Sequence, residues 1–539
     1  MLPGWILNRI RSARGILLQQ NFFRVFGVGT TMMNSLLRLV AITGFLLASP
    51  CIRSAPAAPA PPSRPGIVLM MGDDHGWEET GYNRHPHVRT PVLDEMAASG
   101  LRFNRFHAGH SNCSPTRASF LTGRNPNRMG TYAPGWSFRP EEITMAHALS
   151  EAGYRCGHFG KWHVGPVRAD SPVSPGAMGF QEWLSHDNFF ETNPVLSRNG
   201  GPPQQIAGES SEILVDEAIR FIDAATTARQ PFLAVIWFGS PHEPYIGLPE
   251  DLALYDDLPA AYTKSVSLTS VETGDQVRRS QGEVLRERYA EITAMDRAIG
   301  RLRQHLQDAG LRDNTLVFYC GDNGTPPEAS LGRPHRGMKS TLYQGGLLVP
   351  GVLEWPARIP QPLSSELPAC TSDLLPTVCA AAGAKLPRRV LDGIDLGPLL
   401  AGELERRPRP LCFWEFDIRQ AKTSQAEPWI DPQLQEGTTP LLKLMDGKAT
   451  RDFRNFRLPE AASLTPGGNA AVVDGQWKFI VHHNGRDVIR KELFDLTADP
   501  GESLSVLEAQ PAIAANLEQE LRQWQGSVLK SLAGEDYTE

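Results

Sequence analysis

The sequence predicts an α/β fold in which helices cover a mostly parallel β-sheet. Three apolar runs, at residues 66–72, 231–238 and 315–320, show no alternation of polar and apolar side chains. Such runs are typical of strands buried on both faces. Helical patterns separate the runs, and strands that alternate with helices favour parallel pairing. Polar residues follow each run, so we expect a functional site beyond the carboxyl ends of the strands.

Two helices of this domain have clear signals. Thr90 and Pro91 form an N-cap and first-turn signal for a helix that ends near Gly100. Apolar side chains recur at helical spacing over residues 289–306, and Gly310 closes that helix. Both helices are therefore expected to pack an apolar face against the sheet.

From about residue 405 the sequence predicts a smaller antiparallel sheet with a packing helix. Residues 471–481 indicate a hairpin with a tight Asp-Gly turn, and residues 492–496 indicate a further strand. Apolar side chains over residues 513–528 share one face of a final helix. The polar, turn-rich segment 420–466 predicts no element.

The chain is expected to have three parts. Its 539 residues exceed the size at which one hydrophobic core usually stops growing, so a large domain plus a smaller one is expected. We expect a leader over residues 1–65, a main α/β domain over residues 66–405 and an α+β subdomain over residues 406–539.

The net charge of the chain beyond the leader argues against binding of a polyanion by long-range electrostatic attraction. The first 72 residues contain seven arginines, no lysine and no acidic residue, which leaves 46 basic against 60 acidic residues in the remainder. A body with this negative balance does not attract nucleic acid, so an anionic substrate must meet a local cationic pocket. We therefore expect no nucleic-acid partner.

The leader resembles an export signal. Residues 39–48 form a short apolar run just after Arg38, and residues 55–62 are a Pro/Ala linker. The run is too short to span a bilayer and suits the central region of a signal peptide. We expect a periplasmic or extracellular protein, with an uncleaved N-terminal membrane anchor as the alternative and Met32 or Met33 as possible true starts.

Cysteine spacing points away from zinc and from a complete disulfide framework. The sequence has seven cysteines and no CxxC pair. An odd number leaves at least one thiol unpaired in an exported protein, although Cys370 and Cys379 could pair.

Two acidic dipeptides predict a metal site. Asp73-Asp74 and Asp322-Asn323 each follow an apolar strand and offer only oxygen ligands. Oxygen ligands suit Ca²⁺ or Mg²⁺, whereas zinc prefers nitrogen and sulfur. Either dipeptide alone is better explained as a turn. Both together favour a metal, because adjacent carboxylates need a counter-charge.

A cysteine at a predicted helix start is the candidate nucleophile position. In residues 113–124, Pro115 is placed for a helix N-terminus, so Cys113 would lie at the positive end of the helix dipole, which favours anions. Taken alone, the segment also fits a buried structural cysteine.

This segment resembles the C-x-P-x-R and LTGR signature of the formylglycine-dependent sulfatases. That family has an alkaline-phosphatase-like fold and includes arylsulfatase A-like and N-acetylgalactosamine-6-sulfatase-like members. Further segments resemble family motifs in the family's order, at residues 160–165, 240–244, 321–324, 336–350 and 493–502. Thr116 and Gln344 depart from the usual serine and glutamate, and neither should abolish the chemistry.

The resemblance implies that residues 66–405 form the catalytic domain of a sulfuric ester hydrolase. A formylglycine-generating enzyme would oxidise Cys113, whose aldehyde hydrate attacks sulfur and later expels sulfate. Ca²⁺, with Mg²⁺ as an alternative, would be held by four side chains and by the modified Cys113. The four are Asp73, Asp74, Asp322 and Asn323.

The resemblance also implies roles for the surrounding side chains. Arg117 would fix the formylglycine, and His163 would be the base for elimination. Lys161 and Lys339 would bind sulfate oxygens, and His242 with Lys339 would protonate the leaving oxygen. Ser185 and His186 resemble a substrate-side segment of arylsulfatase A-like members.

Two other functions fit parts of this pattern. A phosphonate monoester or phosphodiester hydrolase can share the scaffold and the signature, and a glycan-binding relative without activity would share only the fold. The presence of both the 160–165 and the 336–350 segments in one chain favours the sulfatase over these alternatives. Sulfated carbohydrates are the expected substrates by family analogy. The sequence predicts neither the sulfate position nor the oligomeric state.

Overall fold

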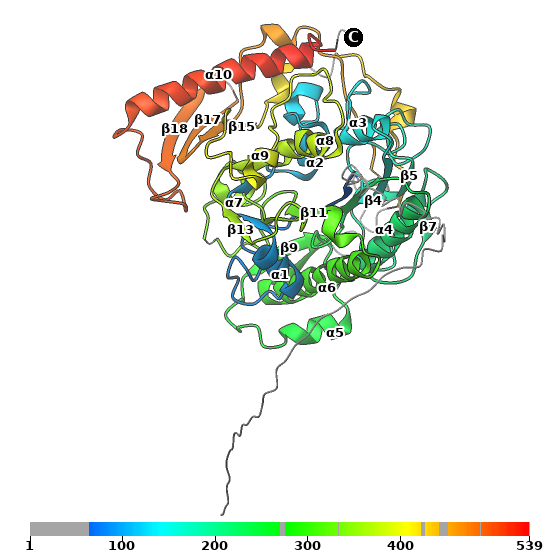
Figure 1. The fold of residues 1–539 in the computed structure, drawn as a ribbon. Coiled ribbons are helices and arrows are strands. Elements are labelled where there is room, and N and C mark those ends of the chain that lie inside the picture. The colour runs from blue at the N-terminus through cyan, green and yellow to red at the C-terminus, as the bar shows by residue number, and fades with distance from the viewer. Residues whose placement is uncertain are drawn as a thin grey trace, which may run out of the picture. The chain divides into compact units, whose positions relative to one another are not determined.

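A ten-stranded sheet lies at the centre of the residues that the computed structural model describes, which are 64–269, 275–332, 334–421, 426–440, 451–485 and 487–537 (Figure 1). In chain order its strands are β1 (Gly66–Gly72), β2 (Leu101–Phe103), β4 (Arg155–Lys161), β5 (Glu182–His186), β6 (Val195–Arg198), β7 (Gln204–Gln205), β8 (Phe232–Trp237), β11 (Thr315–Gly321), β12 (Gly351–Glu354) and β13 (Leu363–Ser365). Their spatial order is β13-β2-β12-β11-β1-β8-β4-β5-β6-β7.

The three predicted strands lie side by side at the middle of this sheet. The central strand β1 pairs in parallel with both β8 and β11, and β8 continues in parallel to β4 and β5. Antiparallel pairing is confined to β12 and to the β6–β7 edge. The prediction of a mostly parallel sheet is therefore confirmed, and its polar strand ends meet at one edge.

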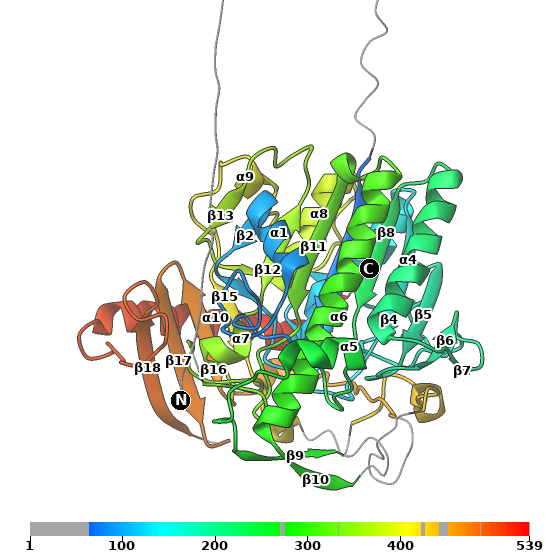
Figure 2. The same cartoon turned by 90° about the horizontal axis from the view of Figure 1, so that it is seen from below.

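Helices cover both faces of the sheet (Figure 2). Alternate residues of β1 point into two cores: Leu69 packs with α2, α3 and α8, whereas Met70 packs with α1, α4 and α6. The helices are α1 (Pro91–Ser99), α2 (Cys113–Thr122), α3 (Met145–Glu151), α4 (Ser210–Thr227), α5 (Pro249–Leu252), α6 (Gln281–Asp308), α7 (Gln344–Leu347), α8 (Leu374–Ala382), α9 (Gly397–Leu400) and α10 (Pro511–Ala533). Burial of both faces explains the continuous apolar strands.

Helix α6 is longer than its apolar periodicity predicts. The pattern begins near Tyr289, whereas the helix begins at Gln281. Ser280 and Glu283 form a capping box that satisfies the first backbone N–H groups of a mostly polar first turn. Local capping therefore extends the helix beyond the part that packs on the sheet.

The C-terminal prediction is confirmed in its elements. Strands β15 (Leu411–Trp414), β16 (Ala470–Asp474), β17 (Trp477–His483) and β18 (Val488–Asp495) form an antiparallel sheet, and the β16–β17 hairpin turns at Gly475. One face packs on α10 through Phe479 and Leu493, and the other packs on α7 through Ile480 and Phe494. Two minor ladders pair β3 (Phe106–His107) with β14 (Ala369–Cys370) and β9 (Ser265–Thr269) with β10 (Gln276–Ser280). The predicted boundary at residue 405 stays a prediction.

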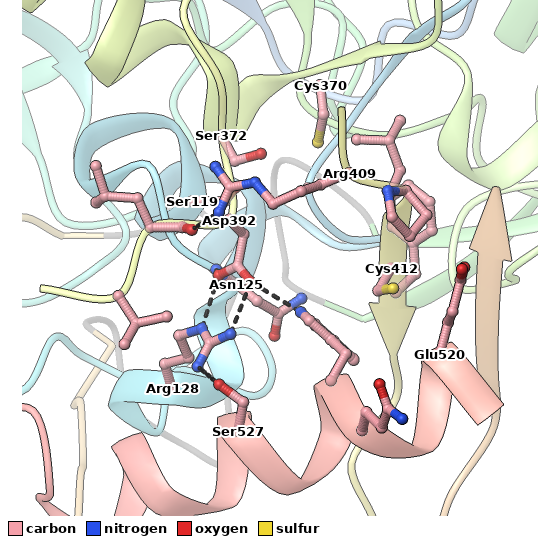
Figure 3. A pocket seen from close by; sticks show the side chains of 18 residues that line it. Ser119, Asn125, Arg128, Cys370, Ser372, Asp392, Arg409, Cys412, Glu520 and Ser527 are labelled. Atoms are coloured by element: carbon pink, nitrogen blue, oxygen red, sulfur yellow. Dashed lines mark hydrogen bonds and ion pairs between the residues drawn. The ribbon is translucent and has the colours of Figure 1, made fainter. Parts of the chain in front are cut away.

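A pocket of about 370 Å³ lies where α10 meets the main domain (Figure 3). Arg128 and Asp392 form a bidentate ion pair in its wall, and Cys370 and Cys412 also line it. The described cysteines are all free thiols, so the suggested Cys370–Cys379 disulfide is wrong. Cys379 lies on α8 in the main core, packed among apolar side chains.

Residues 1–63 of the predicted leader, which include the apolar run at residues 39–48, lie outside the described part of the chain. Within the described ranges, no helix combines the length and the apolar character that crossing a bilayer requires.

Candidate active site

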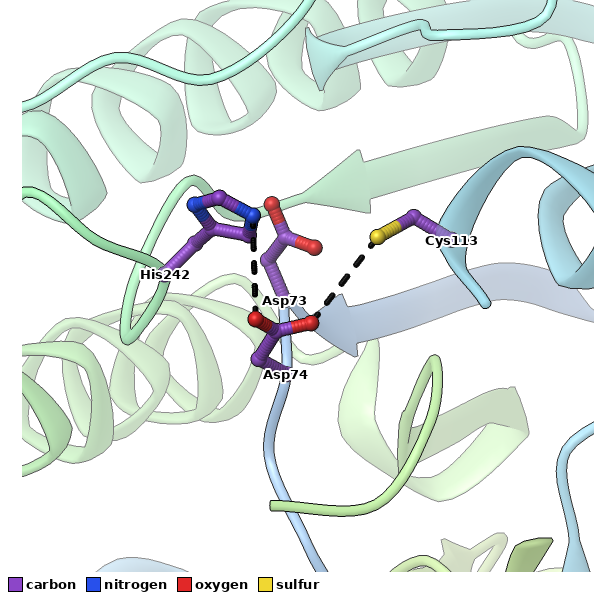
Figure 4. Close-up of side chains that lie close together, drawn as sticks. All are labelled: Asp73, Asp74, Cys113 and His242. Atoms are coloured by element: carbon purple, nitrogen blue, oxygen red, sulfur yellow. Dashed lines mark hydrogen bonds and ion pairs between the residues drawn. The ribbon is translucent and has the colours of Figure 1, made fainter. Parts of the chain in front are cut away.

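Cys113 begins helix α2 and points toward the carboxylate that follows β1 (Figure 4). Its Sγ lies 3.8 Å from Oδ1 of Asp74, and the side chain is buried. The Thr116 hydroxyl donates to the carbonyl of His110, and the Ser114 hydroxyl donates to the carbonyl of His163. These contacts fix the first turn of α2 with position 113 facing the site.

The four oxygen-bearing side chains come together as the strand topology requires. Asp73 and Asp74 follow β1, and Asp322 and Asn323 follow the adjacent strand β11. The Asp74 backbone N–H donates to Asp322 Oδ1 at 2.8 Å, and Asn323 Nδ2 donates to Asp74 Oδ1 at 2.8 Å. Ligand atoms of Asp73, Asp74, Cys113 and His242 all lie within 4.8 Å of one another.

The chemistry of this cluster fits a hard divalent cation. Oδ1 of Asn323 is buried and, among the described residues, accepts no hydrogen bond. Burial, together with the charge of Asp73, raises the pKa of the Asp322 carboxyl to about 8. Crowded carboxylates and an unused amide oxygen are the donors that Ca²⁺ or Mg²⁺ takes, so the residues present suit either ion.

Three cationic side chains surround the carboxylates. Arg117 donates from Nη2 to Asp322 at 2.8 Å and lies 3.3 Å from Asp73, and Lys161 pairs with Asp73 on its other side. The Lys339 ammonium lies 2.6 Å from Asp74. Although burial raises the pKa of the Asp74 carboxyl, Lys339 and His242 lower it to about 2, so Asp74 is ionised at neutral pH.

Two histidines flank the cluster with different environments. The ring nitrogens of His163 are buried and have no hydrogen-bond partner among the described residues. Burial, reinforced by the charges of Lys161 and Arg451, keeps the pKa of His163 well below its usual value. Two contacts fix the orientation of the His242 ring. Its Nδ1 lies 2.6 Å from the carbonyl oxygen of Glu243, and its Nε2 lies 3.6 Å from the Asp74 carboxylate.

The structure gives the two substrate-side residues other partners. Ser185 is buried within β5, and its hydroxyl lies 2.8 Å from Nδ1 of His158. His186 Nδ1 accepts from the Asn188 backbone, and its Nε2 lies 3.1 Å from the carbonyl of Pro440. Neither contact reaches the carboxylate cluster, so their substrate-binding role stays a prediction.

Sequence reasoning missed an aromatic wall of the site. The Phe189 ring stacks on His242 with centroids 4.9 Å apart and planes 9° from parallel, and the Lys161 ammonium lies 5.9 Å from its centre. The Arg117 guanidinium, which contacts Asp322, lies 5.0 Å from the centre of the Trp237 ring. Phe189 directly follows the Ser185–Asn188 run, which was the one available signal.

A buried helix start that is flanked by cationic side chains and faces a cluster of carboxylates has the chemistry that hydrolysis of an oxyanion ester with a divalent cation requires. The chain belongs to the sulfatase family, because the family model described as Sulfatase matches residues 65–384. It is therefore a sulfuric ester hydrolase, as the resemblance of its motifs predicts.

Individual relatives agree with this assignment. Human arylsulfatase A is 31% identical over 490 residues, which cover 86% of this chain and 87% of the relative. Dog N-acetylgalactosamine-6-sulfatase is 28% identical over 427 residues, covering 71% and 75%. The solved structure of Ps i-CgsB with k-i-k-neocarrahexaose superposes with a TM-score of 0.67 at 22% identity, covering 86% of this chain and 93% of that one. At that identity the structural likeness shows the fold alone.

Proposed function

We propose that this enzyme removes sulfate from carbohydrates by means of a formylglycine at position 113 and a calcium ion. One observation carries the proposal: Cys113 starts a helix with its Sγ 3.8 Å from Oδ1 of Asp74, an oxygen that the Lys339 ammonium also contacts at 2.6 Å. A nucleophile at position 113 and a sulfate group held by cations would therefore share one small space.

An unmodified Cys113 thiol would be a poor nucleophile at this position. Burial raises the pKa of the Cys113 thiol far above neutrality, and the charges of Lys161 and Lys339 do not offset it. A protonated thiol is a poor nucleophile. A hydrated aldehyde at this position would supply a hydroxyl nucleophile and a route for sulfate release.

Calcium is the cation that the donors suit best. Asp73, Asp74, Asp322 and Asn323 would hold it, and none of these residues exposes more than 1% of its surface. A bound ion would act as a Lewis acid toward the sulfate group. A buried cluster that supplies several carboxylate and amide oxygens favours Ca²⁺, because Mg²⁺ usually keeps more of its water.

The cationic side chains would bind and orient the ester. Arg117 is held by Asp322 and by its donation to the carbonyl of Lys161 at 3.0 Å, so its guanidinium is a fixed support for position 113. Lys161 and Lys339 would oppose the charge of the sulfate oxygens as it grows in the transition state. The Lys161 side chain exposes no surface and that of Lys339 exposes 18%, so water competes least for the Lys161 ammonium.

The two histidines would move protons. His163 has a neutral imidazole with free ring nitrogens, which suits a base near position 113. His242, whose Nε2 faces Asp74, and Lys339, which stays protonated, would deliver a proton to the leaving oxygen.

A carbohydrate substrate is supported by the relatives. One is named N-acetylgalactosamine-6-sulfatase, and a protein of the same fold was solved with the oligosaccharide k-i-k-neocarrahexaose. The signal-like leader supports export, which would place the enzyme where sulfated glycans are found.

The test combines maturation and turnover. The protein is produced together with a formylglycine-generating enzyme, and the tryptic peptide 106–117 is analysed by mass spectrometry for loss of the Cys113 sulfur. Sulfate release is measured on an aryl sulfate and on a panel of sulfated mono- and polysaccharides, with an aryl phosphate diester as comparison. Cys113→Ala should abolish sulfate release, whereas Cys379→Ala should retain it.

Faster cleavage of the diester than of any sulfate by fully converted, calcium-loaded enzyme would favour the phosphodiesterase alternative. Release of sulfate from the aryl ester but from no sugar would overturn only the carbohydrate part.

A further inference from the structure

Arg288 lies in the first third of helix α6 and exposes no surface. Its guanidinium pairs in bidentate geometry with Glu79, from Nε to Oε1 at 2.7 Å and from Nη2 to Oε2 at 2.6 Å. The same group donates from Nη2 to the backbone carbonyl of Asp74 at 2.6 Å and from Nη1 to the backbone carbonyl of Pro241. These four donations use all three guanidinium nitrogens.

The two carbonyls belong to separate segments of the active site. Asp74 follows β1, and Pro241 precedes His242 in the segment that follows β8. Asp74 also has a positive φ of 63°, a conformation that a non-glycine residue keeps only where its surroundings hold it. Arg288 is therefore a bridge between the segment with a carboxylate ligand and the segment with the acid.

Glu79 extends this bridge to a third segment. Its Oε2 accepts from the Gly76 backbone at 3.2 Å and from the Thr325 hydroxyl at 3.1 Å. Thr325 follows the Asp322-Asn323 pair, and its carbonyl accepts from the Lys339 backbone at 3.0 Å. The ion pair thus contacts the segments after β1, β8 and β11.

The geometry of these contacts requires a guanidinium. Only a planar group with several fixed donors can hold a carboxylate and two carbonyls in different directions. A lysine at position 288 would offer one point charge and could not keep both carbonyl contacts with the bidentate pair. The charge of Glu79 makes the buried arginine neutral as a pair, so its field contributes little to sulfate binding.

We propose that Arg288, held by Glu79, is a positioning residue that fixes Asp74 and His242 relative to each other for sulfate-ester hydrolysis. This inference rests on the proposed roles of Asp74 and His242. It assigns Arg288 no contact with the substrate. Its effect acts through the two backbone carbonyls, because displacement of reacting groups by about 1 Å can lower a rate by about 100-fold.

The alternative is a purely structural ion pair, and helix α6 offers a matched control. Arg303 lies on the same helix and makes a buried bidentate pair with Glu354, with both contacts at 2.8 Å. That pair lies near α1 and the strand β12, and its described contacts reach none of the site residues. Arg288→Lys and Arg303→Lys therefore remove the same kind of interaction, and only the first loosens the site.

The experiment compares the two variants as full-length, matured enzymes. Peptide 106–117 is checked for equal conversion, and kcat, KM and Tm are measured with an aryl sulfate. We expect Arg288→Lys to lower kcat by about 100-fold with a small change in KM, and Arg303→Lys to change kcat by less than about 3-fold at a similar loss of Tm. Glu79→Asp, which keeps the charge but shortens the arm, should lower kcat by an intermediate factor.

Equal losses of kcat in the Arg288→Lys and Arg303→Lys variants, or an unchanged kcat in folded Arg288→Lys, would overturn the positioning role. If Arg288→Lys does not fold, Glu79→Asp decides by the same comparison. A wild-type enzyme that cleaves aryl sulfate without calcium would refute the metal in the proposed function, while the ratio between the variants would still test Arg288.

Discussion

The ammonium group of Lys478 lies 2.6 Å from the carboxylate of Glu502, and neither side chain exposes any surface. Glu502 also accepts from the Gln344 backbone at 2.5 Å, and Lys478 donates to the Gln344 side chain at 3.2 Å. Gln344 begins α7, five residues after Lys339. A buried ion pair of the C-terminal part therefore supports the segment that carries Lys339.

Removing one partner of this pair should destabilise the protein strongly. Lys478→Met leaves the Glu502 carboxylate buried without a counter-charge, which typically costs about 3–5 kcal/mol. The double variant Lys478→Met/Glu502→Gln should recover most of the loss, because no uncompensated charge remains. Denaturant unfolding checks both values. Lys491→Met, which breaks a partly exposed pair with Glu518, should cost no more than about 1 kcal/mol. Similar losses for Lys478→Met and Lys491→Met would contradict the argument.

Phe189 should affect turnover more than substrate binding. Its ring stacks on the His242 imidazole, whose Nδ1 is held by the carbonyl of Glu243. Phe189→Ala removes the ring that keeps His242 against Asp74, so kcat should fall by about 10-fold to 100-fold, while KM changes less. Phe189→Tyr keeps the aromatic face and should retain most activity. A loss confined to KM would instead assign Phe189 to substrate contact.

The sequence could predict those site residues that end a strand. Asp74 and Asp322 follow apolar runs, and parallel neighbours such as β1 and β11 end at one edge, so topology alone brings their side chains together. Cys113 was predictable at a helix start because Pro115 marks that position. These inferences need only local pattern and strand order.

Other residues depend on packing that no local pattern records. Arg288 lies within a helix whose periodicity shows only its apolar face, and its partners are far along the chain. Ser185 lies on β5, where side chains alternate between the two faces, and its hydroxyl is turned toward His158, a contact that the sequence does not predict. A change of one residue in the alignment moves a strand side chain to the other face of the sheet, and a resemblance between loops does not determine the alignment to within one residue.

The ion pair in the wall of the α10 pocket should make stability depend on pH. Burial alone would raise the pKa of the Asp392 carboxyl, but Arg128 outweighs it and lowers the pKa to about 2. The folded-state pKa lies below the unfolded value, so the stabilisation is present above about pH 4 and is lost as pH falls toward 2.

Asp392→Asn should therefore destabilise the protein by about 2 kcal/mol at pH 7, with a difference that shrinks below about pH 4. Thermal unfolding of both proteins from pH 7 to pH 3 measures the difference. Asp216→Asn, which removes an exposed pair with Arg301, should show little difference at any pH. A constant gap between wild type and Asp392→Asn across this range would rule out the linkage.

Calcium removal should lower both stability and activity. Asp73, Asp74 and Asp322 crowd three carboxylates into a buried cluster, and a divalent ion that binds only the folded state stabilises it by about 2.7 kcal/mol at about 100 times its Kd. A calcium chelator should therefore lower Tm and stop sulfate release, and added Ca²⁺ should restore both. Mg²⁺ should restore less, because it dehydrates reluctantly and demands octahedral geometry.

A variant separates this effect from unspecific ion binding at the acidic surface. Asp322→Asn removes one charged metal ligand but keeps an amide oxygen near Arg117. The fold should therefore persist, while the rise in Tm on calcium binding should become smaller. Glu95→Gln, at an exposed site on α1, should keep the full gain. If chelation left Tm and sulfate release unchanged in the wild type, the cluster would hold no functional divalent ion. Its three carboxylates would then be balanced by Arg117, Lys161 and Lys339 alone.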